Sequence, residues 1–198
     1  MRMTAGNLER LPIMDRTVRI ARLVFLAFLA LYGVASLRAP EAGRLLDSVD
    51  LAIHETGHLV FAPLGEVPGF LGGTLFQLLL PAAFTAYFLR RGDRYGGAVC
   101  LWWVAQNCWN VSVYVADARL EELPLVGGGE HDWAYLLGAA GWLEHDIAIA
   151  RAVHRLGIAL FVIAIWLGFR AANWMQPAEI GRRAAPLNER TPARDSLR

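Results

Sequence analysis

Charged residues are scarce in this chain. They make up 19% of the 198 residues, whereas hydrophobic residues make up 56%. A soluble domain needs a more polar surface than this, so the composition excludes an ordinary soluble protein and indicates an integral membrane protein. The formal net charge is only +1, which offers no basic surface for nucleic acid. We therefore expect the lipid bilayer, and not nucleic acid, as a partner.

Cysteine is also rare. The two cysteines, Cys100 and Cys108, fall within one apolar segment and lack the spacing of a C-x-x-C metal motif. This pattern excludes a disulfide framework, and we interpret both residues as buried thiols. The chain shows no internal repeat, and its length suits one helical bundle rather than two domains. The sequence leaves the oligomeric state open.

Apolar segments of helical length predict an all-α, polytopic membrane bundle of about four to six transmembrane helices. We expect helices at residues 20–37, 47–64, 69–89, 95–118 and 152–172, with an amphipathic segment at 133–150. The bundle would extend from residue 20 to 172, after a cytoplasmic segment at 1–19 and before a disordered tail at 173–198. The first apolar run has the charge order of a signal peptide, but its long polar lead favours a retained membrane helix.

Arginine positions bear on orientation, and two topologies are compatible with them. Six full spans would place the arginines at 90–94 on the side opposite the arginine-rich N-terminal segment. Four spans, with residues 47–64 and 133–150 re-entrant or interfacial, place these arginines and both termini inside. We favour four spans in a membrane of the bacterial inner or plasma-membrane type, with cytoplasmic termini.

Two of the five histidines form the pentapeptide His-Glu-Thr-Gly-His from His54 to His58. Residues four apart share one face of a helix, so both imidazoles can bind one zinc ion while Glu55 acts as general base toward a metal-activated water. The surrounding residues, 51–64, are strongly apolar, so we expect this helix to be membrane-embedded. The pattern predicts a zinc metalloprotease site.

Zinc catalysis requires a third protein ligand and an open position. Asp117 is the first choice, because an ionisable residue near the hydrocarbon is costly unless it has a function. Its alternative interpretation is an interfacial residue paired with Arg119. His131 and Asp132 are the alternative ligands, since the three glycines at 127–129 make a loop that could carry them to the metal.

Two further patterns lie close to the pentapeptide. Asp47 and Asp50 share its polar stripe one or two turns earlier, where we expect them to orient the ligands or to lie at the membrane interface. In the next segment Gly69 and Gly73 are four residues apart, a spacing that favours close helix packing in lipid.

These residues resemble the site-2 protease family of intramembrane zinc metalloproteases. In that family the H-E-x-x-H motif lies in a membrane helix, and a later helix supplies an Asn followed about two turns later by an Asp that binds zinc. Here Asn110 and Asp117 are seven residues apart. The resemblance implies a zinc site of His54, His58 and Asp117, with Glu55 activating water and Asn110 positioning or polarising the substrate carbonyl. It covers mainly residues 47–120 and leaves no room for a peptide-binding accessory domain, as in a minimal or divergent relative.

The resulting hypothesis is a membrane zinc metalloprotease that hydrolyses peptide bonds of membrane-associated protein substrates. Two alternatives stay open. The same activated water could hydrolyse lipid amides, or the chain could be a non-catalytic metal-binding scaffold in which Glu55 only supports the ligands. Zinc is the expected ion, although two histidines and a carboxylate suit several divalent metals.

Overall fold

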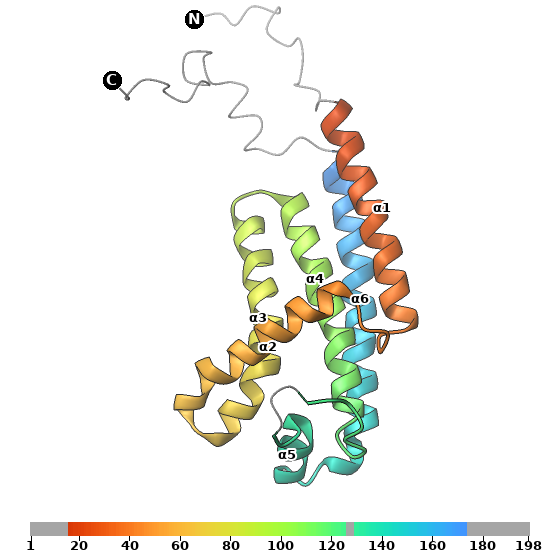
Figure 1. Cartoon of the computed structure of the whole chain (residues 1–198). Helices are drawn as coiled ribbons and strands as arrows, with labels where there is room; N and C mark the ends of the chain where they lie inside the picture. Colours follow the sequence, from red (N-terminus) through yellow and green to blue (C-terminus); the bar gives the residue numbers. More distant parts are fainter. Residues whose placement is uncertain (1–15, 126–128, 174–198) are drawn as a thin grey trace, which may run out of the picture.

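The computed structural model describes residues 16–125 and 129–173, and the regular structure within them is entirely helical (Figure 1). The expectations for residues 1–15, for Gly127 and Gly128, and for the tail from residue 174 lie outside the described residues. Two 3₁₀ turns, Ala62–Leu64 and Leu143–His145, accompany the α-helices. The α-helices are α1 (Arg16–Arg38), α2 (Leu45–Phe61), α3 (Glu66–Arg90), α4 (Arg94–Ala116), α5 (Asp132–Ala139) and α6 (Asp146–Ala172). The expected all-α class is confirmed.

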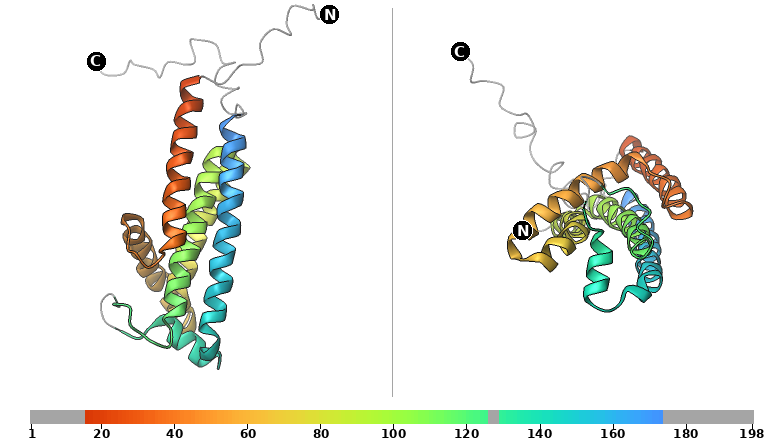
Figure 2. Two further views of the ribbon diagram at one scale, coloured as in Figure 1. Left: turned by 90° about the vertical axis from the view of Figure 1, so that its right-hand side faces the viewer. Right: turned by 60° about the horizontal axis from the view of Figure 1, so that its bottom comes forward.

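Four long helices, α1, α3, α4 and α6, run roughly along one axis, and α2 crosses them obliquely (Figures 1 and 2). α4 is central, because it packs most extensively against α6 and also contacts α1 and α3. The short helix α5 lies at the end of the bundle away from the first residue of α1 and the last residue of α6 (Figure 2). The described chain therefore begins and ends at the same end of the bundle.

Three helical segments are long and apolar enough to cross a membrane. They are Arg16–Arg38, Glu66–Arg90 and Leu143–Ala172. Large apolar side chains are exposed on their outer faces, among them Phe28 and Leu31 on α1 and Trp166 and Phe169 on α6. Because extensive apolar surface is unfavourable in water, these faces suit contact with lipid.

A buried polar network connects α2 to α4. The Asp50 carboxylate is fully buried and accepts hydrogen bonds from Trp103 Nε1 at 2.8 Å and from Asn107 Nδ2 at 3.3 Å. On the preceding turn of α2, Asp47 accepts a hydrogen bond from Gln106 Nε2 at 2.8 Å. Burial raises the pKa of Asp50 to about 6, against the opposing effect of these donors. The two aspartates thus hold the first half of α2 in a defined orientation on α4.

The segment at 133–150, expected as one amphipathic element, is divided in the structure. α5 ends at Ala139, and Gly141 then adopts a φ of 68°. This left-handed backbone conformation, which glycine adopts at little cost, ends the helix. α6 begins at Asp146 and not at residue 152, so the second half of the segment belongs to the long last helix.

Glycines allow α2 and α3 to cross in close contact. A Cβ atom on Gly57 would collide with the carbonyl oxygen of Gly72, and a Cβ on Gly72 would lie 2.7 Å from the carbonyl oxygen of Gly57. Neither position can carry a side chain unless the helices move apart. Gly57 is part of the histidine pentapeptide, so this crossing determines how the motif faces α3.

We expect Gly57→Ala to lower the free energy of unfolding by about 1–3 kcal/mol, because the added methyl group overpacks the crossing. Thermal unfolding of the detergent-purified protein, followed by circular dichroism, measures this change. Gly138→Ala in α5 is the matched control, since a Cβ there meets no atom within 4 Å. A Gly57→Ala variant as stable as the wild type would show that the helices do not cross as described.

Candidate metal centre

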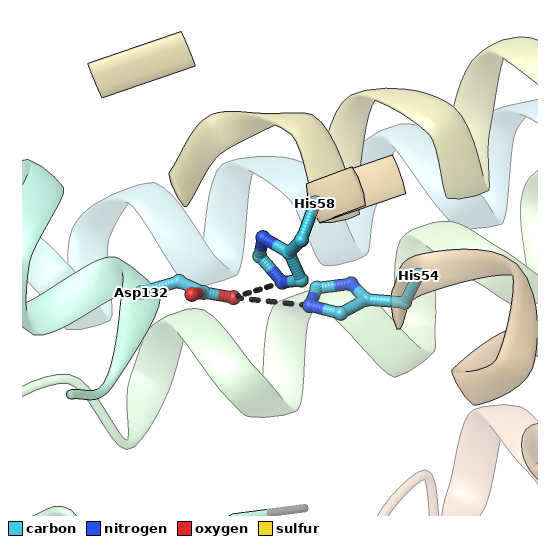
Figure 3. A group of neighbouring side chains, drawn as sticks. All are labelled: His54, His58 and Asp132. Atoms are coloured by element: carbon cyan, nitrogen blue, oxygen red, sulfur yellow. Dashed lines mark hydrogen bonds and ion pairs between the residues drawn. The ribbon is translucent and has the colours of Figure 1, made fainter. Parts of the chain in front are cut away.

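The two histidines of the pentapeptide and Asp132 point toward one another (Figure 3). The Asp132 Oδ2 atom lies 3.0 Å from His54 Nε2 and 3.2 Å from His58 Nε2. In a tetrahedral zinc site with metal–ligand distances of about 2.0–2.1 Å, neighbouring ligand atoms are about 3.3 Å apart. The three side chains could therefore hold a metal ion with only small movements.

Two hydrogen-bond acceptors on α3 orient the two imidazoles. His54 Nδ1 lies 3.1 Å from Gln77 Oε1, and His58 Nδ1 lies 2.8 Å from the carbonyl oxygen of Gly69. Both partners are acceptors, so each Nδ1 carries the proton and each Nε2 is directed at the Asp132 carboxylate. A neutral imidazole with its proton on Nδ1 has only a lone pair at Nε2. The arrangement thus requires a cation, either a second proton or a metal ion, between the imidazoles and the carboxylate.

The charges of the group agree with this requirement. The hydrogen bond to Asp132 raises the pKa of His58 to about 9, and the backbone carbonyl of Gly69 acts in the same direction. Burial opposes ionisation of Asp132, but the contacts with His54 and His58 outweigh it and lower the pKa of this carboxyl. The site therefore combines a buried carboxylate with an environment that stabilises positive charge beside it.

Gln77 connects the centre to α4. Its side chain is buried, and its Nε2 donates a hydrogen bond of 2.9 Å to Asn110 Oδ1. Asn110, the residue expected to polarise the substrate carbonyl, is thus linked to His54 through Gln77 and is not itself in the group of three. The role of Gln77 was not predicted from the sequence, where its signal is a single amide in a strongly apolar segment.

Gly73 borders both ligand nitrogens. A Cβ at this position would lie 2.5 Å from His58 Nε2 and 2.6 Å from His54 Nε2. Any side chain here would occupy the space in front of the two nitrogens where an ion would bind. Gly73, predicted from its spacing to Gly69 to serve helix packing, therefore also leaves room for a metal ion.

Tyr114 and His131 determine where α5 begins. The Asp132 N–H donates a hydrogen bond of 3.3 Å to Tyr114 Oη, and the Ala134 N–H donates one of 3.2 Å to His131 Nδ1 at the helix N-cap. The Tyr114 ring also contacts His54 edge to face, with ring centroids 5.8 Å apart, and packs on His131 at 4.2 Å. α4 therefore positions the carboxylate on the first turn of α5.

Asp117, the first choice for the third ligand, lies outside this group. Its carboxylate oxygens accept hydrogen bonds from the backbone N–H groups of Glu122 and Leu123, both at 3.0 Å. His131 Nε2 lies 3.4 Å from Asp117 Oδ2, at an ion-pair distance but without hydrogen-bond geometry. Asp117 thus stabilises the turn after α4, and Asp132, the alternative ligand, takes the place beside the two histidines.

Arg119, the alternative partner suggested for Asp117, forms an ion pair with Asp146 instead. The Arg119 Nε atom lies 2.7 Å from Asp146 Oδ2, and the Asp146 side chain is almost completely buried. This pair joins the turn after α4 to the first residue of α6. The turn after α4 is therefore stabilised twice, by the hydrogen bonds to Asp117 and by the ion pair of Arg119 with Asp146.

Two cavities meet at the candidate centre. One, of about 590 Å³, lies between α2, α4 and the chain after α4, and the other, of about 550 Å³, lies between α2, α3 and the start of α5. Both are lined by His54, Glu55 and Tyr114. The half-buried Glu55 therefore lines both cavities, as do His54, Tyr114 and Leu125. A substrate in either cavity would meet Glu55 and a ligand histidine together.

Comparisons of the chain with protein-family models, with curated proteins and with solved structures return no match. The class of the protein therefore rests on its own features. It is an all-α chain with three helical segments able to cross a membrane and a His-His-Asp group that could hold a metal ion.

We expect about one zinc ion per chain in the purified protein, lost in His58→Ala and in Asp132→Ala, because each substitution removes one of only three protein ligands. Asp117→Asn should keep the metal and lower the melting temperature, since it removes one of the two acceptors for the turn. Metal analysis of the detergent-purified variants tests both expectations. Zinc lost in Asp117→Asn but retained in Asp132→Ala would assign the third ligand to Asp117.

We expect Gly73→Ala to reduce zinc content strongly, because its methyl group would stand in front of both ligand nitrogens. Gly69→Ala is the matched control one helical turn away, where a Cβ would lie 3.6 Å from the nearest atom. Zinc titration monitored by an indicator dye, together with a circular dichroism spectrum, separates metal loss from unfolding. Equal zinc affinity in the two variants would argue against an ion in this position.

Proposed function

We propose that the chain is a membrane-embedded zinc metalloprotease that hydrolyses peptide bonds of membrane-associated protein substrates. The observation that carries the proposal is the convergence of His54, His58 and Asp132 next to Glu55, where two cavities meet. Two imidazole nitrogens among three ligands favour zinc over the oxygen-preferring magnesium and calcium. The resemblance of the pentapeptide to that of the site-2 protease family supports the same reaction.

In the proposed reaction His54, His58 and Asp132 hold the ion, which when bound supplies a Lewis acid that lowers the pKa of water and polarises a carbonyl group. Glu55 accepts a proton from the attacking water as the water oxygen bonds to the peptide carbonyl carbon. Glu55 then delivers this proton to the leaving nitrogen as the C–N bond breaks. The products are a carboxylate and an amine.

Asn110 has a positioning role in this proposal. Its Oδ1 accepts the hydrogen bond from Gln77, and its side chain lines the larger cavity together with Glu55. With Oδ1 engaged, the Nδ2 group is the part of the amide that would donate to a substrate carbonyl. Gln77 and Gly69 keep each Nδ1 protonated, which directs both Nε2 lone pairs toward the ion.

We further propose that α1, α3, α4 and α6 cross the membrane and that α2 and α5 enter it only partly. α2 lies obliquely to the four long helices (Figure 1), and its exposed side chains include the large apolar Leu45 and Leu59. α4, unlike the other three, is not among the described segments that are long and apolar enough to cross a membrane, but its Gln106 and Asn107 side chains are buried in the bundle. A polar residue that is hydrogen-bonded inside a bundle is tolerated at membrane depth.

Arginine positions orient this arrangement. The Tyr95 hydroxyl at the start of α4 donates a hydrogen bond of 2.7 Å to the carbonyl oxygen of Arg22 on α1. The arginines near the start of α1 and those at 90–94 between α3 and α4 therefore lie toward the same end of the bundle. The positive-inside rule places this end in the cytoplasm and the end that carries α5 toward the opposite face.

We expect Glu55→Gln to keep its zinc and to lose proteolytic activity by a factor of about 10²–10⁴, because the amide cannot accept the proton. The assay uses the zinc-loaded protein in lipid vesicles with a synthetic peptide that has an apolar stretch flanked by lysines. Glu144→Gln, an exposed glutamate on the 3₁₀ turn Leu143–His145, is the matched control and should cleave like the wild type.

Three results would contradict this proposal in different ways. Cleavage by Glu55→Gln at the wild-type rate would exclude Glu55 as the base. Release of fatty acid from lipid amides by the wild type, with every peptide left intact, would favour the lipid-amide hydrolase. Zinc binding without either reaction would favour the non-catalytic scaffold.

A further inference from the structure

The two cavities that meet at the candidate centre differ in chemical character. The cavity between α2 and α4 has apolar walls formed by Leu51, Val111, Val113 and Leu123. This lining suits the aliphatic side chains of a substrate, because burying them removes apolar surface from water. Apart from Glu55, the acidic and basic side chains of this cavity, Glu41, Arg44 and Asp47, belong to the segment around the start of α2.

The cavity between α2, α3 and α5 is acidic. Glu66, on the first turn of α3, and Glu130, just before α5, line it beside Glu55 and Asp132, and the described residues that line it include no lysine or arginine. Phe70 also lines this cavity, and its ring stacks on Tyr135 with centroids 4.0 Å apart. Carboxylates beside an aromatic ring are the partners that a lysine or arginine side chain prefers.

We propose, resting on the protease function above, that the centre selects a substrate segment at the boundary between an apolar stretch and a lysine or arginine. The apolar residues occupy the cavity between α2 and α4, and the cationic residue occupies the acidic cavity, with Glu66 and Glu130 as the residues that determine specificity. The scissile bond then lies at His54 and Glu55, which both cavities share.

Transmembrane segments are apolar, and lysine and arginine flank them most often on the cytoplasmic side. The acidic cavity lies beside the first residues of α3 and α5, at the end of the bundle that the proposed orientation directs to the opposite face. The selected segments would therefore be those that carry a cation on that face. A segment of this kind would place its apolar residues in the cavity between α2 and α4 and its charged flank in the acidic cavity. Glu66 and Glu130 are both exposed, so the attraction is partly screened by water and salt, and the selectivity it produces is moderate.

The test compares peptides that share one apolar stretch and carry Lys, Gln or Glu at one flanking position. One set of three peptides has this position before the stretch, and a second set has it after the stretch. In lipid vesicles we expect the zinc-loaded wild type to cleave the Lys peptide with a kcat/KM about three- to tenfold above that of the Glu peptide, as for two exposed ion pairs. The double variant Glu66→Gln, Glu130→Gln should reduce this ratio to about one. Glu144→Gln is the matched control and should keep it.

A binding experiment separates failure of this proposal from failure of the protease function. Zinc-loaded Glu55→Gln protein binds the same fluorescent peptides, and fluorescence anisotropy measures their Kd without requiring cleavage. Preferential binding of the Lys peptide, lost when Glu66→Gln and Glu130→Gln are added, would support the cationic subsite even if no peptide is hydrolysed. Equal binding of the Lys and Glu peptides, or a Lys preference that survives the loss of both glutamates, would overturn it.

Discussion

The close contact between α2 and α3 at Gly57 and Gly72 is the constraint on which the candidate centre depends. With no side chain between the two backbones, the histidines of α2 reach acceptors on α3, namely Gln77 and the carbonyl of Gly69. These contacts determine which nitrogen of each ring carries its proton. A wider spacing would leave each Nδ1 without its partner and each Nε2 without a defined direction.

α4 brings the remaining part of the centre into place. On one side it holds the first half of α2 through Asp50, and on the other it holds the start of α5 through Tyr114. The carboxylate of Asp132 is therefore positioned relative to the histidines by a helix that carries none of the three side chains that could hold a metal ion. The turn stabilised by Asp117 continues α4 toward α5. Buried polar groups of this kind are costly unless they are paired, so the network favours one arrangement of the helices.

Local patterns predicted a large part of the fold, and longer-range features were missed. Apolar runs of helical length located the long helices, because each run must bury or shield its own backbone and side chains. The division of the segment at 133–150 was missed, since its amphipathic pattern continues across Gly141 although the backbone there turns. The places of Gln77 and Gly73 beside the histidines were not predicted. They depend on how α3 crosses α2, and the residues of α3 alone do not determine this crossing.

The sequence by itself determined the pairing of His54 with His58 and the position of Glu55 between them, because residues four apart on a helix share one face whatever surrounds it. Only the tertiary structure showed which of the candidate third carboxylates lies beside these histidines. Asp117 and Asp132 both follow α4 and both carry an acidic side chain, so residue type could not separate them. They differ in their partners. Asp117 accepts hydrogen bonds from the backbone of the turn after α4, whereas Asp132, whose N–H donates to Tyr114 Oη, lies beside the histidines.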